Sequence, residues 1–203
     1  MLETSRSIPA TRGSILDRND FPLAVSINQY DLYALKNFSE DDFKQLKDFL
    51  ILNKDFPAIK QINKKTLIFS NLSFAQYESI KNLKLSGIEI ESFQKRYYPL
   101  GEQIATLIGF AGKDGFGLEG LENILDSELS GVAGRETIYR NASRRPKVTQ
   151  EVIKGSNKKL TIDSRIQFYS YKHLSSFVEA NNAKGGSAIV LDNISGEILA
   201  IAS

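Results

Sequence analysis

A chain of 203 residues, of which 41% are hydrophobic, is long enough to bury a core, so its composition argues against intrinsic disorder. Its formal net charge is only +2, with acidic and basic residues interspersed, and we therefore expect no nucleic-acid partner. The absence of cysteine excludes disulfides, thiolate metal sites and cysteine nucleophiles, and no apolar run approaches the ~20 residues that span a bilayer.

Residues 12–26 predict a β-hairpin rich in charged and turn-forming residues. Ile15 and Leu16 belong to its first strand, residues 17–20 form a polar turn, and residues 23–25 form the returning strand. Asp20 occupies a turn position that favours left-handed backbone, which Asp tolerates better than most residues.

The next segment alternates helices and strands. Ser39 is expected to cap a helix with an acidic first turn, and its buried stripe consists of Phe43, Leu46, Phe49 and Leu50. Ser73 and Gln76 form a capping box for a second helix. Strands predicted at 66–69 and 88–91 flank that helix, which is an α+β pattern.

Residues 102–110 favour a helix, and a further helix is expected from Glu119 to Gly131. Its apolar side consists of Leu121, Ile124, Leu125 and Leu129. Two strands follow, at 135–139 and 148–153, and a basic loop joins them. The basic residues of this loop are Arg140, Arg144, Arg145 and Lys147.

A boundary is expected near Gly155. After it we predict a strand at 160–162, a helix capped by Asp163 and ending near residue 180, and an apolar strand at 188–191 that is covered on both faces. An antiparallel partner follows at 198–202. So small a sheet is incomplete by itself. We therefore divide the chain into residues 1–155 and residues 156–203, and interpret the second part as the beginning of a larger α/β domain.

The acyl-transfer signature S-x-x-K occurs twice, from Ser92 to Lys95 and from Ser156 to Lys159. The signature needs a helix, where positions three apart share a face, but both copies fall in predicted strands or strand entries. The companion K-T-G is missing. We therefore predict no catalytic residue and no activity for this chain alone, although a self-sufficient enzyme that uses Ser92 or Ser156 is the competing hypothesis.

Other candidate sites are weaker. Residues 115–120 match G-x-G-x-x-G, but a helix and not a strand precedes them, so we expect no dinucleotide or other cofactor. His173 lies within a predicted helix without a cluster of other ligands, and no metal site is expected. Glu119 and Glu122 could form a carboxylate pair of the kind that hydrolyses glycosides.

Three short blocks follow one another along the chain: R-G-x-I-x-D-R at 12–18, R-x-x-P-x-G at 96–101 and G-x-x-G-x-E at 117–122. Together they resemble the N-terminal, non-penicillin-binding module of class B penicillin-binding proteins. The residues of these motifs, with Glu119, are the ones we expect at a structural junction or interaction site: Arg12, Gly13, Asp17, Arg18, Arg96, Pro99, Gly101, Gly117, Glu119, Gly120 and Glu122.

The resemblance continues through residues 160–163, 186–192 and 196–200, which in that family open the transpeptidase domain. The two tyrosines after Arg96 and the run at 107–110 look most like the division-specific, septal member, with the elongation-specific relative as the nearest competitor. One departure is the Arg144-Arg145 pair, where the family often has Gly-Arg.

This resemblance implies a non-catalytic pedestal, or dimerisation, module followed by the first strands of a peptidoglycan D,D-transpeptidase domain. The parent enzyme would cross-link peptidoglycan through a serine acyl-enzyme that β-lactams intercept. It would lie on the periplasmic side of the bacterial inner membrane, with an anchor that precedes residues like these, and would bind division or cell-wall proteins such as a glycosyltransferase. A free-standing interaction protein derived from the pedestal is a further alternative.

Charge and position lead to one geometric expectation. Arg12 or Arg18, together with Arg96, should approach Glu119 or Glu122 where the three blocks meet, because buried arginine–carboxylate pairs can be bidentate and fix orientation.

Overall fold

The computed structural model describes residues 3–47, 62, 64–139 and 147–203. The chain divides into two compact units, one comprising Met1–Ser26 with Arg96–Ser203 and the other Ile27–Lys95. Both units combine helices with strands, and the expected α+β class is confirmed. Each unit has its own hydrophobic core.

The unit Ile27–Lys95 combines two helices with three strands, of which β3 and β4 pair antiparallel. Its elements are β3 (Pro22–Ala34), α1 (Glu40–Lys47), β4 (Thr66–Leu72), α2 (Phe74–Asn82) and β5 (Ile88–Tyr97), with β3 between β4 and β5. Their buried residues form one core, which includes Tyr30, Leu32, Ala34, Phe38, Leu46, Ile62, Leu72 and Ile80.

Both helices of this unit begin with the caps that the sequence predicts. The Asp42 amide donates to Ser39 Oγ (3.1 Å), while the Ser39 amide donates to Asp42 Oδ2 (2.9 Å). Ser73 and Gln76 form the expected capping box of α2. Phe49 and Leu50, expected in the stripe of α1, lie outside the described residues.

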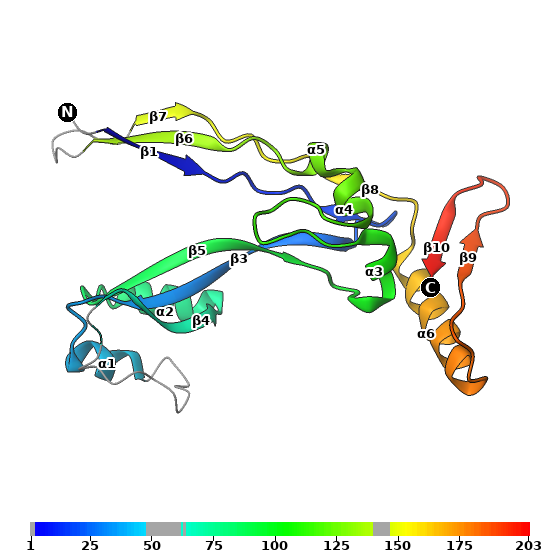
Figure 1. Ribbon diagram of the computed structural model, residues 1–203, viewed down its shortest axis with the longest axis horizontal. Coiled ribbons are helices and arrows are strands. Elements are labelled where there is room, and N and C mark those ends of the chain that lie inside the picture. The colour runs from blue at the N-terminus through cyan, green and yellow to red at the C-terminus, as the bar shows by residue number, and fades with distance from the viewer. Residues whose placement is uncertain (1–2, 48–61, 63, 140–146) are drawn as a thin grey trace. The chain divides into compact units, whose positions relative to one another are not determined.

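In the other unit, β1 (Glu3–Ile8), β6 (Gly134–Tyr139) and β7 (Lys147–Gln150) form an antiparallel sheet in the order β1-β6-β7, as Figure 1 shows. The strand predicted at 148–153 is shorter than expected, since β7 ends at Gln150. Beyond it, Ile153 forms only an isolated bridge with Val132. Of the predicted basic loop, Lys147 begins β7, whereas Arg140, Arg144 and Arg145 lie outside the described residues.

The predicted hairpin is confirmed. Strand β2 (Ile15–Leu16) pairs with β3, and Asp20 adopts the left-handed conformation with φ of 64°. Strand β8 (Lys158–Lys159) lies parallel to β2 and begins two residues before the strand predicted at 160–162. The prediction was wrong there because the ladder ends with the bond from the Leu160 amide to the Leu16 carbonyl, after which the chain turns into a helix cap.

Helix α3 (Glu102–Ile108) is present as predicted, but the single helix expected at 119–131 is wrong. The chain forms α4 (Gly120–Ile124) and α5 (Asp126–Leu129), which are separated at Leu125, where φ and ψ of −96° and 11° leave the helical region. As a result Ile124 is 75% exposed while Leu129 is fully buried. The core of this unit contains Ile15, Leu23, Ala24, Ile104, Ile108, Leu129 and Ile162.

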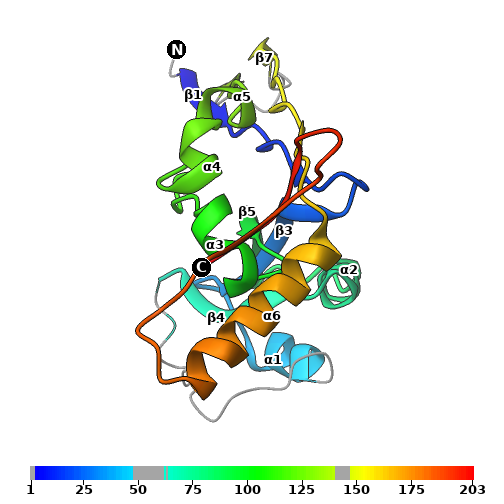
Figure 2. The same cartoon turned by 90° about the vertical axis from the view of Figure 1, so that its right-hand side faces the viewer.

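The last three elements are α6 (Ser164–Ala180), β9 (Ala188–Leu191) and β10 (Ile198–Ala202), all of which the sequence predicts. Asp163 caps α6 by accepting from the amides of Arg165 and Ile166. Helix α6 lies against β10 (Figures 1 and 2). Ile189 and Leu191 in β9 are 62% and 59% exposed, so the described residues do not supply the cover expected on both faces of this strand.

Candidate functional site: a buried arginine–carboxylate cluster

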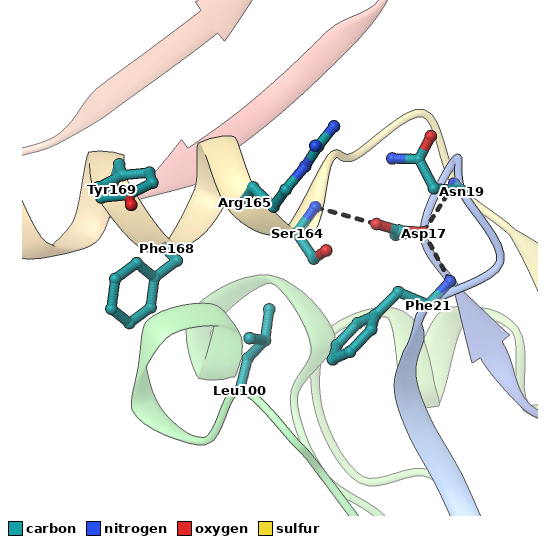
Figure 3. Close-up of a pocket in the computed structure, with 8 residues that line it drawn as sticks. All are labelled: Asp17, Asn19, Phe21, Leu100, Ser164, Arg165, Phe168 and Tyr169. Atoms are coloured by element: carbon teal, nitrogen blue, oxygen red, sulfur yellow. Dashed lines mark hydrogen bonds between the residues drawn. The ribbon is translucent and has the colours of Figure 1, made fainter.

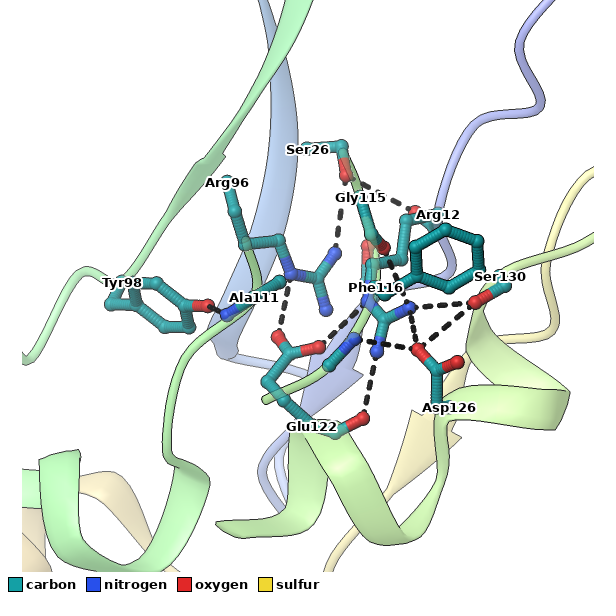
Figure 4. Close-up of polar contacts among 12 residues, drawn as sticks. Arg12, Ser26, Arg96, Tyr98, Ala111, Gly115, Phe116, Glu122, Asp126 and Ser130 are labelled. Atoms are coloured by element: carbon teal, nitrogen blue, oxygen red, sulfur yellow. Dashed lines mark hydrogen bonds and ion pairs between the residues drawn. The ribbon is translucent and has the colours of Figure 1, made fainter. Parts of the chain in front are cut away.

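The carboxylate of Glu122, in α4, lies between two arginines (Figure 4). Glu122 Oε2 accepts from Arg12 Nε at 2.7 Å, and Glu122 Oε1 accepts from Arg96 Nε at 2.7 Å. The Glu122 side chain is 0% exposed and both arginine side chains are 6% exposed. The three residues come from the first hairpin, from β5 and from α4, so one buried carboxylate joins all three sequence blocks.

Arg12 uses all of its side-chain nitrogens. Its Nη1 donates to Asp126 Oδ1 (2.6 Å), to Ser130 Oγ (2.8 Å) and to the Gly115 carbonyl (3.0 Å), and its Nη2 donates to the Glu122 carbonyl (2.8 Å). A buried guanidinium without acceptors would destabilise the fold, so this saturation explains how Arg12 is accommodated.

Two glycines of the third block allow the backbone to approach this cluster. A Cβ atom at Gly117 would lie 1.9 Å from the Glu122 carbonyl oxygen, while the Gly117 amide donates to Asp126 Oδ1 at 2.7 Å. Gly120 has a φ of 57°, and a Cβ there would lie 2.6 Å from the Gly109 amide nitrogen. Only glycine satisfies both requirements, which accounts for the spacing of the G-x-x-G-x-E motif.

The cluster balances two guanidinium groups against two carboxylates. Burial by itself would raise the pKa of Asp126, but donation from the Gly117 amide, Arg12 and Ser130 holds that pKa below its ordinary value. Both oxygens of Glu122 already accept from arginines, so Glu122 offers neither a free base nor a nucleophile. The arrangement is therefore suited to holding segments together, and it does not support the glycosidase interpretation of Glu119 and Glu122.

The structure brings together Arg12, Arg96 and Glu122 of the expected junction, and leaves two other candidates outside it. Arg18 pairs with Glu197 at 3.2 Å, with both side chains more than a third exposed. Glu119 is the exposed N-cap residue of α4. Of the two arginines and the two glutamates considered, Arg12 and Glu122 are the buried ones.

The remaining motif residues shape the chain around the cluster. Pro99 and Gly101 lie in the turn before α3, where Gly101 has a φ of 53°. At Gly13 the backbone passes so close to Ser156 that a Cβ would lie 2.1 Å from the Ser156 carbonyl oxygen.

Asp17 forms a second polar contact that ties the first hairpin to α6 (Figure 3). It is fully buried, and its carboxylate accepts from the amides of Asn19 (2.7 Å), Phe21 (2.8 Å) and Ser164 (3.0 Å). Burial would raise the pKa of Asp17, but these donors keep that pKa below its usual value. The hairpin turn therefore supplies an acceptor to the first amide of a helix that begins 147 residues later.

The cap residue Asp163 belongs to the same contact. Asn19 Nδ2 donates to Asp163 Oδ2 at 3.0 Å. Burial opposes ionisation of Asp163, but Arg165, Asn19 and the amides at the start of α6 lower its pKa to about 2. Asp163 is thus an anion over the physiological pH range and stabilises the positive end of α6.

An open groove of about 620 Å³ lies beside this contact (Figure 3). Its lining consists of Asp17, Asn19, Phe21, Leu100, Ser164, Arg165, Phe168 and Tyr169. Four of these residues, Phe21, Leu100, Phe168 and Tyr169, are apolar or aromatic, and at the polar side the Asp17 carboxylate accepts from the Ser164 amide.

Sequence reasoning missed Asp126, Ser130 and Gln167. The first two follow Glu122 at steps of four residues, which is a helical repeat of polar residues on one side and could have pointed to the cluster. Gln167 is buried in the first turn of α6, four residues after the cap residue Asp163. A polar residue at an inward position of an amphipathic helix was its only signal.

The expected local structure of the catalytic signatures is confirmed. Ser92 and Lys95 both lie in strand β5, and Ser156 lies two residues before β8, so neither S-x-x-K opens a helix. Helix α3 precedes the G-x-G-x-x-G segment, which lacks the strand that a dinucleotide site needs. His173 lies within α6, with its ring 6.4 Å from that of Tyr169 between centroids.

Among the described residues, no group of three or more histidine, aspartate or glutamate side chains could hold a metal ion. No helix in this part of the chain is sufficiently long and apolar to span a membrane.

Comparison with known proteins gives a consistent family. Residues 7–160 match the family model described as the penicillin-binding protein dimerisation domain. The chain is 34% identical over 219 aligned positions to the probable peptidoglycan D,D-transpeptidase PenA of Neisseria gonorrhoeae, covering 98% of the chain and 37% of PenA. It is 33% identical to the peptidoglycan D,D-transpeptidase FtsI of Escherichia coli K12, covering 98% of the chain and 36% of FtsI.

Solved structures agree. Penicillin-binding protein 2X from Streptococcus thermophilus is similar with a TM-score of 0.78 and 25% identity, over 98% of this chain and 35% of the other. A structure described as a peptidoglycan synthase complex that coordinates polymerization and crosslinking gives a TM-score of 0.78 and 25% identity. The match covers 100% of this chain and 39% of the other. The chain thus spans little more than a third of the length of PenA and FtsI.

Proposed function

The chain belongs to the penicillin-binding protein dimerisation-domain family, and from that premise we propose that it is the non-catalytic pedestal and partner-binding module of a septal peptidoglycan D,D-transpeptidase. In this proposal residues 1–155 form the pedestal and residues 156–203 begin the transpeptidase domain. The similarity to PenA and FtsI supports the assignment to peptidoglycan synthesis. The septal role in this proposal rests on the sequence resemblance around Arg96 to the division-specific member.

The observation that carries the proposal is the buried contact of Glu122 with Arg12 and Arg96. Arg12 and Arg96 precede Glu122 in the chain by 110 and 26 positions, and both bond its carboxylate. The segments that carry them cannot separate from α4 without leaving a buried charge unpaired. Such a contact favours a rigid support, and it offers no group free for acyl transfer.

The parent protein would cross-link peptidoglycan through a serine acyl-enzyme, on the periplasmic side of the inner membrane. A glycosyltransferase is the partner we favour for the pedestal. The similarity to a peptidoglycan synthase complex that coordinates polymerization and crosslinking supports a partner of that kind.

Export of the chain to the periplasm of a dividing rod-shaped bacterium tests the septal role. A septal pedestal should compete for division partners and produce filamentous cells. The matched control is the Arg12→Ala, Arg96→Ala double variant at equal abundance, which should not produce filaments. Rounded cells would indicate the elongation-specific role, and normal cells would contradict partner binding.

Fluorescent penicillin tests the absence of catalysis. The folded chain should not be labelled, because neither Ser92 nor Ser156 opens a helix with its lysine. Covalent labelling that disappears in Ser92→Ala or Ser156→Ala would instead favour the self-sufficient enzyme.

A further inference from the structure

Gln167 joins three elements through one buried side chain. Its Nε2 donates to the Ile201 carbonyl in β10 at 2.7 Å, and its Oε1 accepts from the Ile201 amide at 2.8 Å. The same Nε2 donates to the Gln103 carbonyl in α3 at 2.5 Å. Gln167 itself is 0% exposed. The side-chain amide thus bonds both polar groups of one β10 residue, as a neighbouring strand would.

This pairing occupies the edge of β10 that β9 leaves free. In the β9–β10 ladder Ile201 lies opposite Ile189, and its amide and carbonyl point away from β9 to Gln167. A strand edge presents unpaired donors and acceptors, and these need partners where they are buried. Gln167 supplies both partners at this position.

The other partner of Gln167 is close in sequence to the arginine–carboxylate cluster. Gln103 lies in the first turn of α3, and the turn that begins this helix is held by bonds from the Gly101 amide to the Tyr98 carbonyl (3.0 Å) and from the Gln103 amide to the Leu100 carbonyl (3.2 Å). Gln103 follows Arg96 by seven positions in the sequence, so the residue that accepts from Gln167 lies one short turn after the arginine that bonds Glu122.

We propose that Gln167 is a positioning residue that fixes β10 relative to α3 through these three hydrogen bonds. This role concerns contacts within the described chain and does not rest on the proposed function. Loss of the amide would leave the Gln103 carbonyl and both polar groups of Ile201 buried without a partner.

Hydrogen exchange of the 203-residue chain, followed by NMR residue by residue, tests this positioning role. In Gln167→Leu the protection of the Ile201 amide should fall by roughly 5- to 150-fold, the range that corresponds to an unpaired buried polar group. The amides of Gly117, in the cluster, and of Asn123, in α4, should keep their protection. A second variant, Gln167→Glu, has Gln150→Glu at an exposed glutamine as its matched control.

Gln167→Glu gives a readout that general destabilisation would not produce. At pH 7 its carboxylate would face the Gln103 and Ile201 carbonyls without a proton to donate, whereas the protonated acid restores one donor. Burial and these carbonyls raise the folded pKa, so stability is present below the ordinary glutamate pKa of about 4.3 and is lost as pH rises through the raised folded value. Protection of Ile201 should therefore be low at pH 7 and recover toward pH 5.

Titration of other groups near Gln167 does not account for a recovery of Ile201 protection between pH 7 and pH 5. Asp163, with a pKa of about 2, and Asp17, whose pKa is also lowered, remain ionised between pH 5 and 7. Glu102 on α3 accepts from the Tyr171 hydroxyl at 3.3 Å and is common to the parent and to Gln150→Glu, so those two proteins correct for it.

A local, acid-reversible loss at Ile201 supports the proposal. Unchanged protection of Ile201 in Gln167→Leu, or an equal loss at Ile201 and Gly117 in both variants, would overturn it. If Gln167→Leu does not fold, Gln167→Glu at the two pH values decides the question alone. No measurement here involves penicillin or cell division, so failure of the positioning role of Gln167 is distinct from failure of the proposed function.

Discussion

The cluster around Glu122 and the β9–β10 hairpin differ in how completely their groups are covered by the described chain. In the cluster, Glu122 is 0% exposed and every side-chain nitrogen of Arg12 has an acceptor. In the hairpin, Ile189 is 62% exposed and Ile194, in the turn, is 94% exposed. In the first region the charged groups are buried and both oxygens of Glu122 have arginine donors, although Arg96 Nη2 has no acceptor. One face of the second region has no cover among the described residues.

This difference separates two kinds of stabilisation. A buried ionic cluster depends on every partner, because each removed group leaves a charge in a site without water. An exposed apolar face contributes little to the stability of the chain that carries it, but it favours association. The hairpin is thus compatible with the proposed beginning of a larger domain, and substitutions in the two regions should differ sharply in effect.

Glu122→Ala should produce the largest effect. It removes the one carboxylate that accepts from both Arg12 and Arg96, and breaking a buried ion pair typically costs roughly 3 to 5 kcal/mol. Urea unfolding followed by circular dichroism measures the loss. Glu119→Ala, at the exposed cap three residues earlier, is the control and should change the free energy of unfolding by less than about 0.5 kcal/mol. Equal losses in the two variants would contradict a special role for the cluster.

A smaller effect is expected at the contact between the first hairpin and α6. Asp163→Ala removes the cap of α6 and should cost about 0.5 to 2 kcal/mol at pH 7. The pKa of Asp163 is lowered to about 2 from its ordinary 3.8, so its stabilisation is present above pH 3.8 and is lost as pH falls toward 2. The difference between parent and variant should therefore shrink over that interval in unfolding measurements at several pH values. A difference that stays constant down to pH 2 would show that the cap acts without its charge.

The sequence predicts most elements because their signals are local. Ser39, Ser73 and Asp163 cap the helices that follow them, and the alternation of turns and apolar residues locates the first hairpin. The break at Leu125 was missed because it depends on distant groups: Asp126 is bonded to Arg12 and to the Gly117 amide, and neither contact can be read from the helix itself.

The candidate site follows the same division. Arg12, Arg96 and Glu122 are marked by family motifs, so their meeting could be anticipated from the resemblance. The sequence does not predict that Arg12 is chosen over Arg18, or Glu122 over Glu119, because the two members of each pair carry the same charge and lie within a few residues of each other. Only the fold determines which member points inward. Gln167 was missed for a related reason, since its partners are the backbone groups of Gln103 and Ile201, which carry no side-chain signature.

The smallest effect on stability is expected in the β9–β10 hairpin. Ile189→Lys places a charge on a side chain that is 62% exposed, so the free energy of unfolding should change by less than about 0.5 kcal/mol. The same change interrupts an exposed apolar surface and should reduce self-association, which sedimentation velocity at several concentrations measures. Ala200→Lys is the control, because Ala200 is fully buried on the neighbouring strand and the same charge there should destabilise strongly. If Ile189→Lys costs as much as Ala200→Lys, the face of β9 is covered after all, and the hairpin is as complete as the cluster.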